Sequence, residues 1–382
     1  MAAQALHLSD PGAGEGATTF VWKQPVEIRF GCGAQAAVAA ELGARPAVVL
    51  AFAPARELGV ADEWIIALGH RLIAWIDVAD GLSSLARAVR LAGQVWPLLE
   101  AHPDAVLIGL GGGTTLDLAK VVRCRAQDGR PSHLTAALRD AASWPPLALA
   151  PLWLVPTTAG TGSEVTRWAT VWDTTGPHAE KRSFDEPFGY ADRAFVDPTL
   201  TPSCPPSVTR DCGLDAFAHA LEAIWNRHAN PVSDALALAA AERILHSLPA
   251  LLKRPSDLSL RTEMSLAALQ AGMAFSQTRT ALAHALSYAV TLEQGIPHGH
   301  ACALWLPTVW ELAVGRNRRV DELLGRLLGG AGAGALAAWL REVGVDPRPE
   351  AVGIADARER VAAALGSARG RNFIGLQEHE AG

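Results

Sequence analysis

Four side chains that ligate divalent metals stand out by their context in the sequence. Asp215 and His219 lie four residues apart in GLDAFAHALEAIW, so a helix would place them on one face, where they could grip one ion. His284 sits within the apolar stretch TRTALAHALSY, and His298 follows the turn-forming segment GIP. A carboxylate with imidazoles suits Fe²⁺, Zn²⁺ or another divalent ion. Each histidine alone also fits a buried structural residue, so spacing by itself does not assign the ligands.

A second set of residues could bind the phosphates of a dinucleotide. Three glycines at 111–113 follow the apolar run AVLIGL and precede a stretch with helical spacing. Backbone N–H groups at a helix start face an anion, and glycines let the anion approach closely. A hydroxyl-rich segment after another apolar run adds donors that suit a ligand crevice. The predicted cofactor residues are Gly112, Gly113, Thr114, Asp117, Thr157, Thr158, Thr161 and Ser163. The alternatives are a tight structural turn and a solvated Ser/Thr loop.

Strands and helices must position these groups, and the sequence predicts them in two halves. Apolar runs at 46–52, 72–78, 104–113 and 151–158 alternate with helical spacing, which includes 82–102 and TTLDLAKVVRCRA (114–126). Such alternation is typical of a parallel α/β sheet. After about residue 206 the chain is rich in Ala and Leu at helical intervals, most plainly over 233–252 and 261–275. The predicted domains are a flexible N-terminus (1–18), an α/β dinucleotide-binding domain (19–197) and an all-helical metal-binding domain (198–382).

Composition excludes several classes of protein. A chain of 382 residues with 49% hydrophobic and 19% charged residues is typical of a soluble globular protein rather than a disordered one. The net charge of −6 argues against a nucleic-acid partner. No apolar run reaches the roughly 20 residues of a membrane span, and no secretory signal is visible. The five scattered cysteines fit reduced thiols, so a cytoplasmic protein is expected.

Six segments occur together in the order found in one protein family. They are FGCGA (30–34), GGGTTLDLAK (111–120), PTTAGTGSEVT (156–166), VDPTLT (196–201), GLDAFAHALE (213–222) and HALSY…GIPHGHACAL (284–304). The sequence therefore resembles the iron-containing (group III) alcohol dehydrogenases, which are related in fold to dehydroquinate synthase and glycerol dehydrogenase. The resemblance implies a dinucleotide-binding domain, a helical domain and a metal in the cleft between them. It implies that Asp215, His219, His284 and His298 hold the metal, and that Lys181 approaches the cofactor.

The sequence departs from the family pattern at two positions. The family often has an aspartate at the end of the first strand, where it holds the ribose 2′-OH and repels a 2′-phosphate. Ala53 stands in that place here, with Arg56 nearby, so NADPH is expected to be accepted and NADH also fits. Many relatives carry a histidine four residues after the third ligand, where this chain has Tyr288. Tyr288 is therefore the single catalytic candidate beyond the metal ligands, and His300 is expected to be structural.

Three segments point to one branch of the family. SQTRTALAHALSY (276–288), VTRWATVWD (165–173) and KRSFDEPF (181–188) look most like the branch that reduces phosphonoacetaldehyde to 2-hydroxyethylphosphonate. The resemblance implies a small anionic aldehyde or alcohol as the substrate, and a homodimer is compatible with it. A dianionic substrate needs cations near the cleft. The candidates are Arg182 and Arg279, the latter expected on one helix with His284; the alternative for Arg279 is a pair with a carboxylate such as Glu263.

Two other functions compete with this interpretation. The same fold could act on a short uncharged alcohol or diol, without anion recognition. A dehydroquinate synthase-like lyase would use the cofactor only transiently and would need several basic residues in the helical domain. A ligand set that includes Asp215 argues against the lyase.

Overall fold

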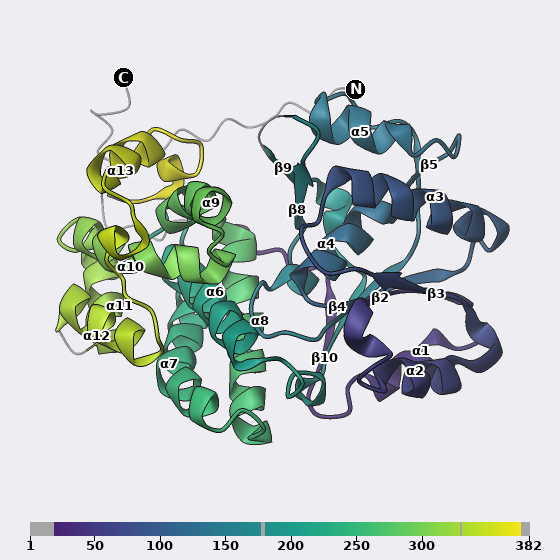
Figure 1. Ribbon diagram of the computed structural model, residues 1–382, viewed down its shortest axis with the longest axis horizontal. Helices are drawn as coiled ribbons and strands as arrows, with labels where there is room; N and C mark the ends of the chain where they lie inside the picture. Colours follow the sequence, from purple (N-terminus) through teal and green to yellow (C-terminus); the bar gives the residue numbers. More distant parts are fainter. Residues whose placement is uncertain (1–18, 177–179, 329–330, 376–382) are drawn as a thin grey trace.

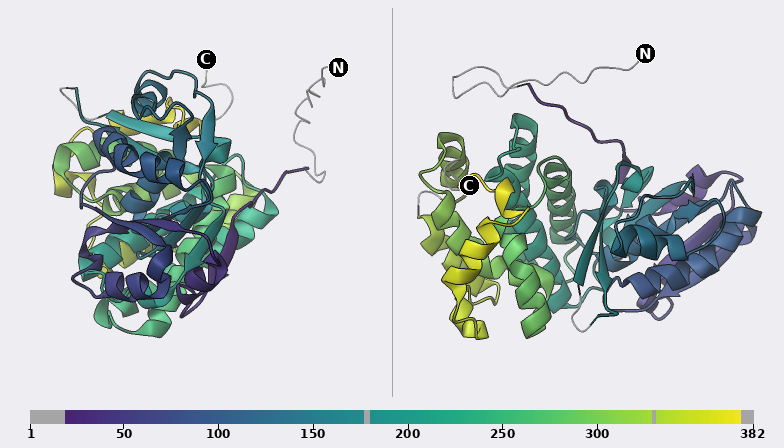
Figure 2. Two further views of the ribbon diagram at one scale, coloured as in Figure 1. Left: turned by 90° about the vertical axis from the view of Figure 1, so that its right-hand side faces the viewer. Right: turned by 90° about the horizontal axis from the view of Figure 1, so that it is seen from above.

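The computed structural model describes residues 19–176, 180–328 and 331–375, and it contains a sheet-based half and a helical half (Figure 1). The sheet-based half comes first in the chain, and the two halves lie side by side in the right-hand view of Figure 2. The predicted fold class, an α/β domain followed by an all-α domain, is confirmed. The flexible terminus predicted over 1–18 lies outside the described residues.

Six parallel strands form the centre of the first half, in the spatial order β1-β10-β7-β4-β2-β3. The central strands β2, β4 and β7 are apolar and buried almost throughout, as expected of a sheet covered on both faces. Helices α1 and α2 pack on one face, and α3, α4 and α5 pack on the other. The strands are β1 (Glu27–Phe30), β2 (Ala47–Phe52), β3 (Leu72–Val78), β4 (Val106–Gly111), β7 (Leu152–Pro156) and β10 (Arg193–Val196). The helices are α1 (Ala36–Leu42), α2 (Val60–Leu68), α3 (Leu85–Ala101), α4 (Gly113–Val122) and α5 (Ser132–Arg139).

The winding of the sheet reverses between β2 and β4. The strand that follows β2 in the chain, β3, lies on one side of it, whereas β4 and then β7 lie on the other. Ligands of open α/β sheets bind outside the carboxyl ends of the strands at such a switch point. Gly111 ends β4 and Gly113 begins α4, so the predicted phosphate loop lies at this point.

Two parts of the first half differ from the prediction. The helix predicted over 114–126 ends at Val122, and β5 (Cys124–Ala126) pairs with β6 (Leu147–Leu149) in an antiparallel ladder. A hairpin of β8 (Trp168–Asp173) and β9 (Glu180–Asp185) was not predicted. The sequence of β9, EKRSFD, does not show the apolar pattern of a strand, because four of its six residues are charged.

Eight α-helices among the described residues form the second half around one apolar core. The segments predicted at 233–252 and 261–275 correspond to α7 and α8. Helix α7 has the length and hydropathy of a membrane span, and it packs between its neighbours α6 and α8, with its buried residues in this core. The helices are α6 (Pro206–Ile224), α7 (Pro231–Lys253), α8 (Leu258–Thr278), α9 (Leu282–Gln294), α10 (His298–Ala313), α11 (Arg318–Leu328), α12 (Gly332–Glu342) and α13 (Ala357–Leu365).

The two halves touch backbone to backbone at a pair of glycines. Gly162 precedes the short helix η3 (Ser163–Val165) with a φ of +59°, and Gly272 lies in α8. A Cβ on Gly162 would lie 2.5 Å from the Cα of Gly272, and a Cβ on Gly272 would lie 2.9 Å from the Cα of Gly162. Only glycine fits both positions, so the hydroxyl-rich loop packs directly on α8.

Buried polar contacts fix α4 against β8. The Nζ of Lys120 donates to the carbonyl of Trp168 at 2.6 Å and to the hydroxyl of Thr166 at 3.3 Å. Asp117, one turn earlier, accepts from Ser163 Oγ at 2.7 Å and from the N–H of Thr170 at 2.8 Å. Burial lowers the pKa of Lys120 to about 8 and raises the pKa of Asp117. The helix that begins at the phosphate loop is therefore held in place by the fully buried Lys120 and the partly buried Asp117.

Replacing the buried Glu164 by Gln should change how stability depends on pH. Burial raises the pKa of Glu164 from 4.5 to about 6. Between these values the folded protein holds a proton that the unfolded chain has released, so stability falls as pH rises through this window. The shift corresponds to about 2 kcal/mol. The thermal midpoint should therefore fall more between pH 4.5 and pH 7 in the wild type than in Glu164→Gln. Substitution of the exposed Glu57 by Gln should leave this pH dependence as it is in the wild type. Parallel wild-type and Glu164→Gln profiles would contradict the burial effect.

Candidate functional site

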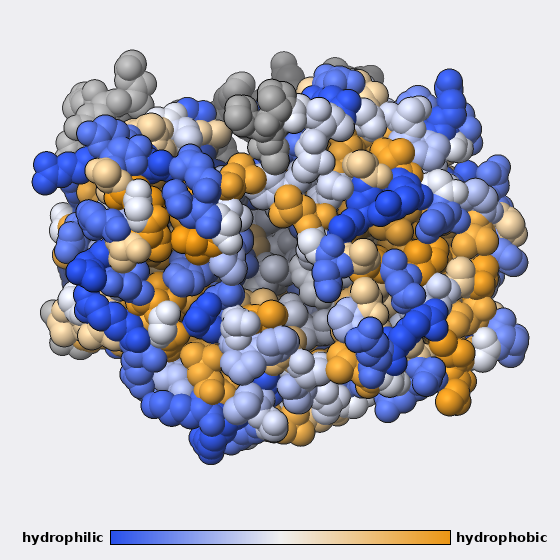
Figure 3. All heavy atoms as spheres, in the orientation of Figure 1, coloured by the Kyte–Doolittle hydropathy of each residue, from blue (hydrophilic) through white to orange (hydrophobic). Residues whose placement is uncertain are grey.

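A cavity of about 470 Å³ lies between the two halves. Figure 3 shows the surface hollowed between them. Its walls come from α4, η3, β8 and β9 in the first half, and from α6, α8, α9, the start of α10 and the chain after α13 in the second. Among its lining residues are all four predicted metal ligands, Asp215, His219, His284 and His298.

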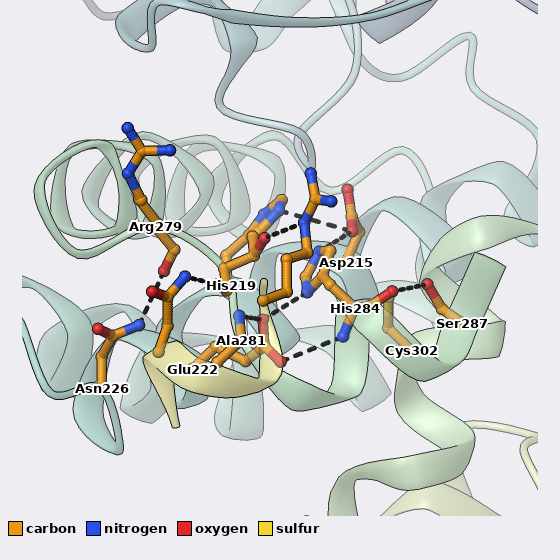
Figure 4. Close-up of polar contacts among 12 residues, drawn as sticks. Asp215, His219, Glu222, Asn226, Arg279, Ala281, His284, Ser287 and Cys302 are labelled. Atoms are coloured by element: carbon orange, nitrogen blue, oxygen red, sulfur yellow. Dashed lines mark hydrogen bonds and ion pairs between the residues drawn. The ribbon is translucent and has the colours of Figure 1, made fainter. Parts of the chain in front are cut away.

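The four predicted ligands converge on one carboxylate oxygen. Asp215 and His219 lie one turn apart on α6, His284 is in the first turn of α9, and His298 begins α10. The Nε2 atoms of His219, His284 and His298 lie 3.8, 3.5 and 3.8 Å from Asp215 Oδ1. Figure 4 shows Asp215, His219 and His284 turned toward one another. Side chains from three helices therefore meet at one point.

Three polar atoms of this cluster have no hydrogen-bond partner in the described part of the protein. Asp215 Oδ1 and His284 Nε2 are buried without a hydrogen-bond partner, as is His219 Nδ1. A buried unpaired carboxylate oxygen is costly unless it coordinates a cation or is hydrogen-bonded. Oxygen and imidazole nitrogen at these separations form a mixed donor set of the kind that Fe²⁺ and Zn²⁺ accept. The residues present fit a divalent metal.

The electrostatics of the cluster leave lone pairs available for a cation. Burial lowers the pKa of His219 to about 4 and that of His298 to about 3, so both rings are neutral at pH 7. Burial alone would raise the pKa of Asp215, but the neighbouring imidazoles outweigh it and hold that pKa below its ordinary value. A deprotonated Asp215 beside the neutral rings of His219 and His298 suits metal binding. Burial would lower the pKa of His284, but the neighbouring Cys302 and Glu222 raise it well above its ordinary value.

Glu222 is a functional residue that the sequence analysis missed. It is fully buried on α6 and accepts hydrogen bonds from His284 Nδ1 at 2.7 Å, from the N–H of Ala281 at 2.6 Å and from the N–H of His284 at 3.1 Å. The bond to Nδ1 leaves Nε2 of His284 facing Asp215, as Figure 4 shows. Carboxylates commonly orient metal-ligating histidines in this way. Its position three residues after His219, on the same buried helix face, was the signal in the sequence.

Cys302 also comes close to the cluster. One atom each of Asp215, His284, His298 and Cys302 lie within 4.8 Å of one another, and the Cys302 thiol is 3.8 Å from His298 Nε2. The cysteine is fully buried in the first turns of α10. The sequence analysis treated all five cysteines as ordinary residues, and all five are free thiols. His300, two residues before Cys302, does not line the cavity.

The predicted cofactor residues divide into two groups. Asp117, Thr161, Ser163 and Lys181 line the cavity. Gly112 and Gly113 lie beside the second loop, because a Cβ on Gly113 would lie 2.6 Å from Thr161 Cγ2 and one on Gly112 would lie 3.3 Å from Thr158 Cγ2. Thr114, Thr157 and Thr158 are not among the residues that line the cavity. The two loops predicted to share a ligand are therefore in contact with each other.

The predicted arrangement of Arg279 is wrong in one respect. Arg279 does not share a helix with His284, because α8 ends at Thr278 and α9 begins at Leu282. Its backbone has a φ of +72° and a ψ of 170°, a conformation that only glycine adopts easily. Asn226 holds this turn by donating to the Arg279 carbonyl at 3.1 Å (Figure 4).

Both predicted substrate arginines have carboxylate partners. Arg279 lines the cavity and pairs with Asp185 of β9 at 2.7 Å, not with Glu263, which pairs with Arg243. Arg182 pairs with Glu180 at 2.6 Å and is not among the residues that line the cavity.

Tyr288 lies in the cavity wall between the cluster and two cations. Its ring stacks on His298 with centroids 5.6 Å apart and an interplanar angle of 3°. Lys181 Nζ lies 3.8 Å from the ring centroid and Arg369 Cζ lies 5.1 Å from it. Burial would raise the pKa of Tyr288, but Lys181 and Arg369 together lower it.

Two family models match the chain in succession. Residues 25–198 match the model described as iron-containing alcohol dehydrogenase. Residues 209–371 match the C-terminal model of the Fe-containing alcohol dehydrogenase family. The two matches fall on the sheet-based half and the helical half.

Individual relatives agree with this assignment. The probable alcohol dehydrogenase EutG of Salmonella typhimurium is 38% identical over 65% of this chain and 65% of its own length, slightly less than two thirds. The phosphonoacetaldehyde reductase of Streptomyces viridochromogenes is 31% identical over 68% of each chain. The solved sulfoacetaldehyde reductase of Bifidobacterium kashiwanohense, in complex with NAD⁺, shares the fold with a TM-score of 0.82 and 24% identity, over 94% of this chain and 95% of that one. The chain belongs to the iron-containing alcohol dehydrogenase family.

Proposed function

We propose that the chain is a metal-dependent, NAD(P)H-linked reductase that converts phosphonoacetaldehyde to 2-hydroxyethylphosphonate. The observation that supports it most is a cavity that combines a cluster suited to a metal with cationic side chains, Lys181, Arg279 and Arg369 among them. An aldehyde oxygen suits the first feature and an anionic group suits the second. Similarity to a phosphonoacetaldehyde reductase and, in fold, to a sulfoacetaldehyde reductase supports the same class of substrate.

The proposal gives each part of the cavity a role. Asp215, His219, His284 and His298 would hold Fe²⁺ or another divalent ion, with Glu222 fixing the orientation of His284. When bound, the metal supplies a Lewis acid that polarises the carbonyl, and the reduced nicotinamide supplies the hydride. Phe275 stacks on His219 with centroids 4.0 Å apart and screens that side of the cluster from water.

The cofactor would bind along the switch point of the sheet, in contact with the two loops and Lys181. Ala53 follows β2 directly, so no carboxylate stands at the end of that strand. Asp77 of the neighbouring strand β3 is paired with Arg56 at 3.0 Å. With its carboxylate neutralised in this way, we propose that NADPH is accepted and NADH is also used. We also propose that the domain boundary lies at 197/198, that the protein is cytoplasmic and that it forms a homodimer.

A panel of aldehydes tests the proposal. Phosphonoacetaldehyde and propionaldehyde differ in charge but have chains of similar length. The metal-loaded protein should consume NADPH stoichiometrically with phosphonoacetaldehyde, with a kcat/KM about tenfold or more above that for propionaldehyde, since one charge-assisted contact contributes about 1.5–3 kcal/mol. NADH should be tested in parallel.

The other outcomes separate the competing functions. A preference for propionaldehyde would support the second candidate, an alcohol dehydrogenase for short uncharged alcohols, which the higher identity to EutG favours. Turnover without net loss of the reduced cofactor would indicate a lyase.

A further inference from the structure

The cavity contains several cations, and their partners differ. Arg279 is neutralised by Asp185 at 2.7 Å, and the same carboxyl group also pairs with Arg167 at 2.8 Å and accepts from the indole N–H of Trp168 at 2.8 Å. Asp185 thus ties the end of α8 to the β8–β9 hairpin. An arginine already bound to a carboxylate in a fixed geometry has less attraction left for a second anion.

Arg369 differs from Arg279, because no carboxylate in the described part of the chain pairs with it. It follows α13 in the chain, and among the described residues its one side-chain hydrogen bond goes from Nε to the neutral hydroxyl of Thr280 at 3.1 Å. No carboxylate of the described residues lies within ion-pair distance of it. Lys181, which lies against the same tyrosine ring, likewise has no carboxylate within that distance among the described residues. Within the described ranges, the two positive charges beside Tyr288 therefore have no carboxylate to offset them.

The position of these charges relative to the metal cluster is set by one aromatic ring. Tyr288 packs against His298, and Arg369 packs against Tyr288. Thr280 joins the arginine to the short turn between α8 and α9, and Asn372 donates to the Thr280 carbonyl at 2.8 Å. Thr280, Tyr288, Arg369 and Asn372 all line the same cavity as His298. The cluster and the guanidinium therefore lie on either side of Tyr288 and line one cavity.

We propose that Arg369, supported by the charge of Lys181 and held by Thr280, forms the subsite that binds the tetrahedral oxyanion of the substrate. The ligand class is a two-carbon aldehyde that carries a phosphonate or a sulfonate. The guanidinium offers its two terminal nitrogens in a planar fork that matches two oxygens of such a group. This subsite rests on the proposed function and replaces Arg279 as the main contact for the anion.

Steady-state kinetics of matched variants test the subsite. Arg369→Gln removes the charge, Arg369→Lys keeps it without the fork, and Arg371→Gln removes a nearby exposed guanidinium that donates to the carbonyl of Gly366. Arg369→Gln should lower kcat/KM for phosphonoacetaldehyde about tenfold or more and change that for propionaldehyde less than twofold. The kcat/KM of Arg369→Lys for phosphonoacetaldehyde should lie between those of the wild type and Arg369→Gln. The kcat/KM of Arg371→Gln should match that of the wild type.

Binding of ethylphosphonate and ethanesulfonate, measured by calorimetry, provides a readout apart from turnover. Arg369→Gln should weaken binding of the ion that the wild type prefers about tenfold or more. An unchanged thermal midpoint would show that the variant is folded. Equal losses for charged and uncharged aldehydes, or unchanged binding of both ions, would overturn the subsite.

The substrate preference of the wild type distinguishes failure of the subsite from failure of the proposed function. A wild type that prefers sulfoacetaldehyde, with the loss in Arg369→Gln intact, would keep the subsite and replace phosphonate by sulfonate. A wild type that prefers propionaldehyde and binds neither ion would overturn both proposals.

Discussion

His284→Ala should lose its metal and its turnover together while it remains folded. The substitution removes a ligand whose Nε2 faces Asp215 Oδ1 at 3.5 Å, leaving three of the four predicted ligands. Loss of a Lewis acid worth several kcal/mol lowers the rate by about a thousandfold, since each 1.36 kcal/mol is a factor of ten. Metal content by elemental analysis and kcat with phosphonoacetaldehyde are the two measurements.

The folded state should survive this change because its core does not depend on the ion. Glu222 keeps its two bonds from the backbone N–H groups of Ala281 and residue 284, so only the Nδ1 contact is lost. His300→Ala is the matched control, since His300 lies two residues from His298 but does not line the cavity. Full metal occupancy and normal turnover in His284→Ala would refute the ligand assignment. Loss of helical circular dichroism on removal of the metal would instead assign the ion a structural role.

Gly113→Val should weaken binding of the dinucleotide much more than it weakens the fold. Gly113 begins α4, and a Cβ there would lie 2.6 Å from Thr161 Cγ2, on the loop that lines the cavity. A branched side chain must therefore displace this loop and fill the space where a phosphate approaches the helix start. The dissociation constant for NADPH, measured by calorimetry, should rise about tenfold or more, as expected if one charge-assisted hydrogen bond is lost.

Gly93→Val is the control for this prediction. Gly93 lies in α3, and a Cβ there would meet no atom within 4 Å. Both variants place valine in a helix, where valine has a somewhat higher propensity than glycine, so Gly93→Val isolates the effect of a side chain placed against Thr161. If Gly113→Val binds NADPH as tightly as Gly93→Val does, the cofactor does not approach this loop.

The sequence predicted the elements whose residues repeat a simple pattern. The buried strands β2 and β4 are continuous apolar runs, and α7 and α8 show long helical periodicity. The ligand candidates Asp215 and His219 were visible because a helix fixes the distance between residues four apart. In each case the information lies within one short segment.

The features that escaped prediction depend on contacts between distant segments. Arg369 is one arginine in a polar stretch, and only the fold brings it to Tyr288. The break between α8 and α9 has no glycine or proline to mark it; it exists because Asn226 and Glu222 bind the turn from outside. No local pattern could indicate these partners, which lie more than 50 residues away.

The paired glycines on η3 and α8 determine how this molecule could open. A contact between two Cα atoms has no side chain to rearrange, and a few residues along α8 the Arg279–Asp185 pair makes a second link to the first half. Two links along one helix are preserved by rolling about its long axis and broken by most other motions. The two halves should therefore rotate relative to each other about the long axis of α8. Phe275 lies on this rotation axis, between the two links, and packs against His219. The part of the cavity wall that Phe275 forms would therefore keep its place while the rest of the cavity widens to admit a substrate.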